Sequence, residues 1–291
     1  MKTVESEVME AVEWDELSFS LTPTRSMYMA ECDLGGEWRP GELIPFGDLS
    51  ISPAAGVLNY GQGVFEGMKA YRSAKDRIVL FRPERNARRF QVSAERLCIP
   101  TLPEEIFMNA VLSTVGDNID FVPPLGKGSL YIRPVVWGTG PVLGVQPAPS
   151  YTFVVYVSPV GPYFKGGMRL LHLEVTKQFH RAAPRGTGNA KAIGNYAASL
   201  YPLKLAKAKG FDEILYLNAS DEACVEEVGS ANLFILSDGV LKTPALDGSI
   251  LPGVTRDSVI QLARERLNME VRETQVSVSD VAQADEVFCT G

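Results

Sequence analysis

Apolar runs separated by glycine and proline divide the first half of the chain into short strands and helices. Strand-like runs are expected at residues 78–81, 130–136 and 152–157, where β-branched and aromatic residues cluster. Pro83 and Pro103 each mark the expected start of a helix, and apolar residues recur at helical spacing after Pro103. The apolar residues of that face are Ile106, Phe107, Ala110 and Val111. The pattern predicts a mixed α+β layout.

A second α+β layer is predicted beyond residues 158–168, a stretch dense in glycine and proline that is typical of an interdomain connection. Its strands are expected at residues 170–175, 214–217 and 233–236. We therefore expect a small α+β domain at residues 1–157, a linker at residues 158–168 and a large α+β domain at residues 169–291.

Two helices are expected in this second region. One runs from about Tyr196 to Lys209 and stops at Gly210, because glycine readily adopts the conformation that ends a helix. Another opens at Thr255, with Thr255 or Asp257 as its cap. The apolar stripe of this helix is predicted to consist of Val259, Leu262, Ala263 and Leu267.

Composition and charge exclude some classes of function for this chain. The chain has 291 residues, of which 45% are hydrophobic, so it can bury a large core. A formal net charge of -7, with basic residues scattered among acidic ones, predicts no nucleic-acid partner. No window reaches the ~20 apolar residues of a membrane span. The acidic N-terminus is unlike a signal or transit peptide, so a cytoplasmic location is expected, or an organelle if a presequence has been removed.

Cysteine and histidine spacing argues against a metal site. The four cysteines lie far apart without a C-x-x-C pair, which also argues against a disulfide framework. The two histidines are not spaced to place both imidazoles on one face of a helix. We expect no bound metal.

Lys191 is the candidate for covalent chemistry. A lysine forms an imine only as the neutral amine, which requires burial or nearby cations. Lys191 lies in the run RGTGNAKAIGNYAASL, where Gly186, Gly188 and Gly194 permit close backbone approach. Taken alone, such a lysine is more often a solvated loop residue, so the assignment depends on other segments.

Three further segments suit pyridoxal phosphate. An electron-sink cofactor needs a carboxylate at its pyridine nitrogen, and Glu226 and Glu227 precede a strand, although only one can face the ring. A phosphate needs a helix N-terminus and a cation, which Val254, Thr255 and Arg89 offer. Each segment also has an ordinary interpretation, as a surface acidic pair, a capped helix or a solvated arginine. Their joint occurrence carries the hypothesis.

Six segments in this order resemble the signature of the branched-chain amino acid aminotransferases, a fold-type IV family of pyridoxal-phosphate enzymes. They read NYGQGVFEGMKAY, LFRPERNARRF, LYIRPVVWG, GTGNAKAIGNYA, EEVGSANLFIL and ILPGVTRDS. The resemblance covers nearly the whole chain and implies two α+β domains that hold the cofactor between them, in a homodimer. It also implies transfer of the amino group of leucine, isoleucine or valine to 2-oxoglutarate, giving branched-chain 2-oxo acids and glutamate.

The resemblance assigns the cofactor residues one by one. Lys191 matches the lysine that holds the cofactor as a Schiff base and moves a proton during catalysis. Tyr196 matches the tyrosine that contacts the phenolic oxygen of the cofactor. Glu227, rather than Glu226, takes the position at the pyridine nitrogen when counted back from Asn232.

The resemblance also assigns the phosphate and the substrate. Arg89, the backbone of Val254, and Thr255 match the phosphate site. The substrate pocket is assigned to the apolar walls Tyr60 and Phe65 and to the carboxylate-holding groups Tyr131 and Arg133. A structural ion pair is the alternative role for the arginine of this pocket.

Several alternatives remain at this point. The family continues past the last residue, Gly291, so the resemblance implies a large domain incomplete at its C-terminus, and an inactive subunit or fragment is one alternative. D-amino acid aminotransferases and aminodeoxychorismate lyases share the lysine and the glutamate, but the runs GQGVFEGMKAY and LYIRP favour the branched-chain enzymes. A G-x-G-x-x-G dinucleotide site is excluded because Lys191 stands where the third glycine belongs.

Overall fold

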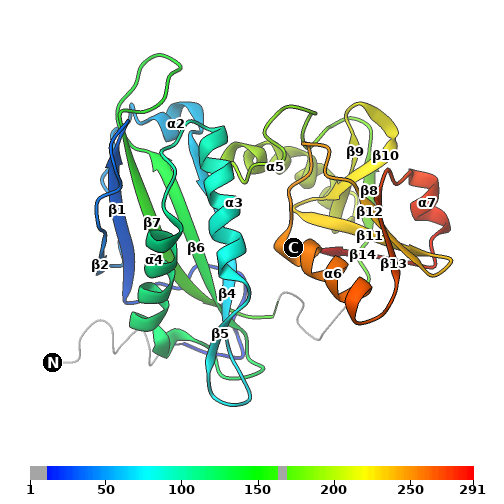
Figure 1. Cartoon of the computed structure of the whole chain (residues 1–291), viewed down its shortest axis with the longest axis horizontal. Helices are drawn as coiled ribbons and strands as arrows, with labels where there is room; N and C mark the ends of the chain where they lie inside the picture. The colour runs from blue at the N-terminus through cyan, green and yellow to red at the C-terminus, as the bar shows by residue number, and fades with distance from the viewer. Residues whose placement is uncertain (1–11, 163–168) are drawn as a thin grey trace. The chain divides into compact units, whose positions relative to one another are not determined.

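The computed structural model describes residues 12–162 and 169–291, and the chain divides into two compact units, Met1–Arg169 and Leu170–Gly291. Each unit combines a seven-stranded sheet with helices, so the α+β class is confirmed (Figure 1). Strand β7 (Ser150–Val160) runs through the start of the stretch expected as a linker. Residues 163–168 of that stretch lie outside the described residues.

The sheet of the first unit is antiparallel throughout its assigned pairs. Its order is β2-β1-β7-β6-β4-β5, and β3 also pairs with β6. The strands are β1 (Ser26–Asp33), β2 (Glu42–Pro45), β3 (Gly63–Phe65), β4 (Met68–Arg72), β5 (Ile78–Leu80), β6 (Ser129–Gly138) and β7. The helices are α2 (Gly56–Tyr60), α3 (Pro83–Arg96), α4 (Glu104–Asp117) and the 3-10 turn η1 (Ile119–Phe121).

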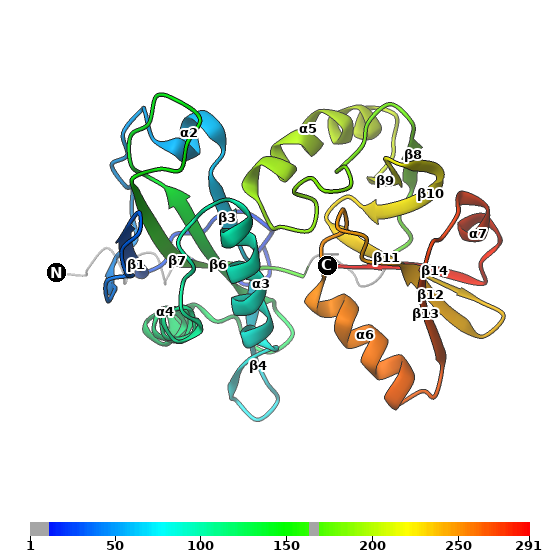
Figure 2. The same ribbon diagram turned by 45° about the horizontal axis from the view of Figure 1, so that its top comes forward.

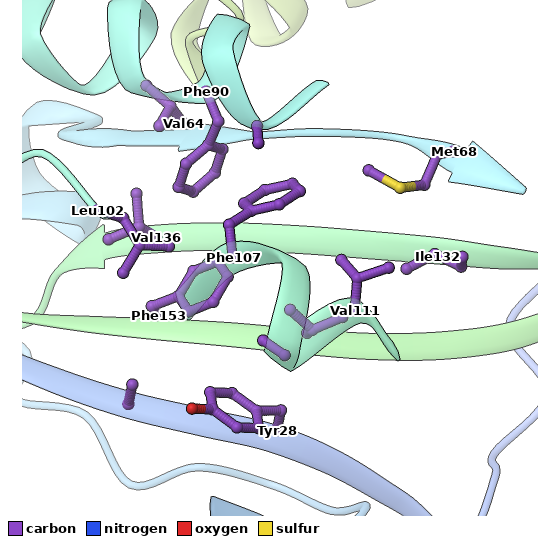
Figure 3. Close-up of a cluster of buried hydrophobic side chains, with 14 of the residues drawn as sticks. Tyr28, Val64, Met68, Phe90, Leu102, Phe107, Val111, Ile132, Val136 and Phe153 are labelled. Carbon is purple, nitrogen blue, oxygen red and sulfur yellow. The ribbon is translucent and has the colours of Figure 1, made fainter. Parts of the chain in front are cut away.

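Helices α3 and α4 bury their apolar sides against one face of this sheet (Figure 3). Phe90 of α3, Phe107 of α4 and Phe153 of β7 meet with ring centroids 5.3 to 6.1 Å apart, a spacing typical of favourable aromatic pairs. The apolar face expected after Pro103 is largely confirmed, since Phe107, Ala110 and Val111 are buried. Ile106 is only partly buried.

Strand β6 carries side chains to both faces of the sheet, because successive residues of a strand point in opposite directions. Leu130 and Ile132 lie in the core beneath the helices. Val135 belongs to a second cluster on the opposite face. Tyr131 and Arg133, at alternate positions between them, share that opposite face.

The sheet of the second unit is mixed. Its order is β13-β12-β11-β10-β9-β8, with β14 also on β11, and the pairs β8 with β9 and β12 with β13 are parallel. The strands are β8 (Leu173–Thr176), β9 (Glu213–Asn218), β10 (Asp221–Val228), β11 (Ala231–Ser237), β12 (Val240–Pro244), β13 (Glu270–Thr274) and β14 (Glu286–Thr290). The helices are α5 (Ile193–Ala208), α6 (Val254–Glu265) and α7 (Val278–Gln283).

The helices of this unit cover both faces of its sheet. Alternate residues of β9 show the division, because Ile214 packs in the cluster that includes Ala206 of α5, whereas Leu215 packs in the cluster that includes Val281 of α7. Helix α6 lies along β13, and α7 lies beside β10 (Figure 2). The expected strand at residues 170–175 starts only at Leu173. Within residues 12–162 and 169–291, the helices lack the length and apolar composition needed to cross a bilayer.

Helix α6 differs in two respects from its prediction. Its N-cap is Gly253, and no side chain caps it, so neither Thr255 nor Asp257 has the expected capping role. Leu262 is 56% exposed and Leu267 lies beyond the helix, also exposed, while Ile260 and Ala263 are buried in the core. Val259 and Ala263 of the predicted stripe do pack in the core beside Ile260, so the buried face of the helix overlaps the predicted face in part.

Candidate active site

Lys191 lies just before α5 and contacts Tyr196 in the first turn of that helix. Lys191 Nζ donates a hydrogen bond of 2.9 Å to Tyr196 Oη. The preceding loop is fixed by the Asn195 amide, which donates to the carbonyls of Thr187 at 2.7 Å and Ala190 at 3.0 Å. The helix thus anchors the glycine-rich loop and directs the amine toward a phenol, a group able to accept or return a proton.

Glu227 provides a buried carboxylate in the same unit. It lies directly opposite Asn232 in the β10–β11 pair, and the Asn232 amide donates to Glu227 Oε1 at 2.6 Å. Burial raises the pKa of Glu227 from 4.5 to about 7, against the opposing charges of Arg181 and Lys191. Lys191 is the other cation that favours the ionised form of this carboxylate.

Arg181 is a central residue of this site that the sequence did not reveal. Its Nη2 lies 2.8 Å from Glu226 Oε1 and 2.9 Å from Glu227 Oε2, and its Nε donates to Glu226 Oε1 at 3.1 Å. Arg181 also donates to the carbonyl of Ser249. No motif marks this arginine, which is far from both glutamates in the chain, so only the fold reveals the contact.

The N-terminus of α6 adjoins the carboxylate through Asn232. Val254 and Thr255 are the first two residues of the helix, as the phosphate-site hypothesis requires. The Asn232 amide also donates to the carbonyl of Leu251 at 3.0 Å. A Cβ at Gly253 would overlap Asn232 Oδ1, so this close approach requires glycine. A helix start without a side-chain cap is suited to an anion.

Arg89 lies on α3 of the first unit, where Glu66 fixes its orientation. Arg89 donates from Nε to Glu66 Oε1 and from Nη2 to Glu66 Oε2, both at 2.7 Å. Asn86 Nδ2 donates to the same Oε2 at 2.8 Å, and Glu66 is fully buried. This two-point pairing orients the guanidinium plane rigidly, which favours recognition of a second anion.

Three of the four expected pocket residues lie together in the first unit. Arg133 Nη2 donates to Tyr131 Oη at 2.9 Å, and its guanidinium carbon lies 4.6 Å from the centroid of the Phe65 ring. The Nε of Arg133 is buried and has no hydrogen-bond partner among the residues that the structure describes. Tyr60 donates instead to the carbonyl of Leu143.

These groups match the chemistry of pyridoxal phosphate. The second unit presents an amine next to a phenol, a buried carboxylate and a helix start without a side-chain cap, and the first unit presents an oriented arginine. Outside residues 1–11 and 163–168, no group of three or more histidine, cysteine, aspartate or glutamate side chains is placed to hold a metal ion. The fold and the groups that each unit presents thus match the chemistry of a class of enzymes that use pyridoxal phosphate.

Comparison with known proteins leads to the same class of enzyme. The family described as "Amino-transferase class IV" matches residues 63–291, and the chain belongs to this family. It is 53% identical over 280 residues to branched-chain-amino-acid aminotransferase 5, chloroplastic, of Arabidopsis thaliana, with 96% of this chain and 67% of that protein aligned. The expected fold-type IV resemblance is thereby confirmed.

Solved structures lead to the same family. The branched-chain amino acid aminotransferase of Escherichia coli superposes with a TM-score of 0.78 at 31% identity, over 92% of this chain and 83% of that one. The branched-chain amino acid aminotransferase of Thermobaculum terrenum, solved in its PLP-bound holo form, gives a TM-score of 0.75 at 27% identity, over 91% and 81%. The expected cofactor is therefore confirmed as that of the family.

Proposed function

We propose that this chain transfers the amino group of branched-chain L-amino acids to 2-oxoglutarate with pyridoxal phosphate. The products are branched-chain 2-oxo acids and glutamate. The observation that carries the proposal is the placement of Lys191 Nζ against Tyr196 Oη, in the same unit as a buried carboxylate whose titration Lys191 influences. The similarity to branched-chain aminotransferases at 53% identity supports the substrate class.

Pyridoxal phosphate, when bound, supplies the electron sink that stabilises negative charge at the substrate α-carbon. Lys191 is the proposed attachment point and proton carrier, since its Nζ can take up the α-proton and return it. Tyr196 Oη, 2.9 Å from that amine, orients it and accepts its hydrogen bond. Glu227 is proposed to face the pyridine nitrogen, where a carboxylate favours the protonated ring.

The remaining residues are proposed to bind anions and the substrate side chain. Arg89 and the α6 N-terminus at Val254 and Thr255 are assigned to the phosphate, because one is an oriented cation and the other a helix start without a side-chain cap. Phe65, Tyr131 and Arg133, which lie together, are assigned to the substrate along with Tyr60. The Phe65 ring suits an aliphatic side chain, and Arg133, whose buried Nε has no hydrogen-bond partner in the described ranges, suits the distal carboxylate of glutamate.

Assembly and location are proposed from similarity alone. We propose a homodimer, as the family resemblance implies, and light scattering of the purified protein tests it. The name of the Arabidopsis thaliana relative places that protein in the chloroplast, which supports an organelle rather than the cytoplasm for this chain. Fractionation of cells that express the natural gene tests the location.

The proposed activity is tested with the purified protein and pyridoxal phosphate. Binding through Lys191 gives a visible absorption band that decreases when leucine is added, and glutamate then forms only if 2-oxoglutarate is present. Lys191→Ala removes the band, whereas Lys204→Ala, at an exposed lysine of helix α5, retains it. A band without glutamate formation would identify the inactive-subunit alternative. Turnover of D-leucine in place of L-leucine would identify a D-amino acid aminotransferase.

A further inference from the structure

A buried cluster of one arginine and two adjacent glutamates lies within the second unit. The side chains of Arg181, Glu226 and Glu227 are 8%, 0% and 4% exposed. The proposed chemistry uses only Glu227. Buried charges are costly, so the presence of the other two side chains calls for a physical reason.

A bulge in β10 allows both glutamates to reach the same arginine. Neighbouring residues of a regular strand point to opposite faces of the sheet. In the pairing with β9, Val225 lies opposite Leu217 and Val228 lies opposite Leu215, so β10 contains one extra residue between these pairs. Glu226 and Glu227 occupy that interval, and both carboxylates contact Arg181.

The charges of the cluster do not balance. Arg181 supplies one positive charge and makes two hydrogen bonds to Glu226, in addition to its 2.9 Å ion pair with Glu227. Burial raises the pKa of both carboxyls, Arg181 opposes that rise in each, and Glu226 adds to it in Glu227. The other charged group acting on Glu227 is Lys191, and Asp247 acts on Glu226.

We propose that Arg181 is a positioning residue that orients Glu227 and keeps it ionised toward the cofactor nitrogen, while Glu226 tunes this contact by competing for the same guanidinium. The inference rests on the proposed role of Glu227 at the cofactor. Arginine suits this task because its guanidinium stays charged and its donors lie in one rigid plane, whereas an ammonium is a mobile point charge. Glu226 draws part of that charge away, so Arg181 and Glu226 act in opposite directions on the proton affinity of Glu227, in addition to burial, the Leu251 N–H and Lys191.

A purely structural role for Arg181 predicts a different outcome. Its bonds to Glu226 and to the Ser249 carbonyl also join β10 to two loops, and their loss would reduce stability whatever the state of Glu227. Stability alone therefore does not separate the two roles. The two roles are separated by whether the pH at which Glu227 titrates rises or falls in each variant.

The test compares Arg181→Lys, Arg181→Gln and Glu226→Gln with the unaltered protein. The titration of Glu227 is followed in cofactor-free protein by NMR of 13C-labelled glutamate carboxyls, with Glu227→Gln to assign the signal. We expect Arg181→Gln to raise the proton affinity of Glu227 by about tenfold or more, and Arg181→Lys to raise it less. Glu226→Gln is expected to lower it by a similar factor, because the competitor and its negative charge are removed together. This last variant reduces the buried charge imbalance, so it retains the fold if Arg181→Gln does not.

The loaded protein gives a second readout. The pH midpoint of the bound cofactor's visible spectrum is expected to move in one direction for Arg181→Gln and in the opposite direction for Glu226→Gln. Arg181→Lys is expected to lower kcat for leucine more than it raises KM. Arg272→Gln is the matched control, because its ion pair with Glu270 lies on the surface of the same unit. Unchanged titrations, or shifts in the same direction for Arg181→Gln and Glu226→Gln, would overturn the proposal. Failure of the unaltered protein to bind cofactor would overturn the proposed function. The titration of Glu227 in cofactor-free protein would still decide whether Glu226 and Glu227 compete for Arg181.

Discussion

The buried carboxyl of Glu227 makes the stability of the cofactor-free protein depend on pH. Burial raises its pKa from 4.5 to about 7, so the folded chain holds this proton more tightly than the unfolded chain. For an acid with a raised pKa, the stabilising contribution is fully present below the unfolded value and is lost as pH rises through the folded value. The shift corresponds to about 3 kcal/mol, most of it lost between about pH 5 and about pH 8.

Glu227→Gln tests this reasoning, because an amide of the same shape does not titrate in this range. We expect the free energy of unfolding of the unaltered protein to fall relative to that of the variant by about 3 kcal/mol as pH rises. The three tryptophans, Trp14, Trp38 and Trp137, all lie in the first unit, so urea unfolding is followed by circular dichroism rather than by tryptophan fluorescence. Parallel stability curves for the two proteins across this range would show that Glu227 titrates near its ordinary value and would refute the argument.

Three further substitutions test the packing around the site and the core. Gly253→Ala places a Cβ against Asn232 Oδ1, which is expected to break the hydrogen bond from Asn232 to Glu227. We expect cofactor binding to weaken by about 1.5 to 3 kcal/mol in an absorbance titration. An unchanged affinity for the cofactor would contradict this. Phe107→Ala removes a fully buried ring and is expected to lower the free energy of unfolding by about 3 to 5 kcal/mol in urea, whereas a loss under about 1 kcal/mol means that the cavity closes. Ser277→Ala removes the capping box of α7 and is expected to cost about 1 kcal/mol by calorimetry, and an unchanged melting temperature would show that this cap contributes nothing.

The sequence predicted those elements whose local pattern agrees with their final environment. Helix α3 starts at Pro83, as expected, because proline fits the first turn of a helix. Strand β1 was not predicted, since it buries residues on both faces and therefore lacks a clean alternation. Tyr28 packs under the helices, whereas Met27 packs on the opposite face of the sheet. In such a strand, burial is decided by neighbours distant in the chain.

The residues of the candidate site also divide into those that the sequence predicted and those that only the fold brings together. From the sequence, the family resemblance pointed to Lys191 and Tyr196, and their 2.9 Å contact is local in the chain. Arg181 could not be found, because its contact with Glu226 spans 45 positions and depends on a bulge that no local pattern announces. The pairing of Arg89 with Glu66 likewise joins a helix to the end of a strand.

The turn between β10 and β11 decides which of the adjacent residues Glu226 and Glu227 lies opposite Asn232. A two-residue turn joins β10 to β11 and pairs Val228 with Ala231, which places Glu227 opposite Asn232. The turn begins at Gly229, whose φ of 52° suits glycine, and a Cβ there would lie 2.5 Å from the Glu213 carboxyl carbon. A slip of one residue would exchange which glutamate meets the asparagine amide. The register of this turn, as much as the glutamate itself, therefore determines which carboxylate meets Asn232 and could take the role proposed for Glu227.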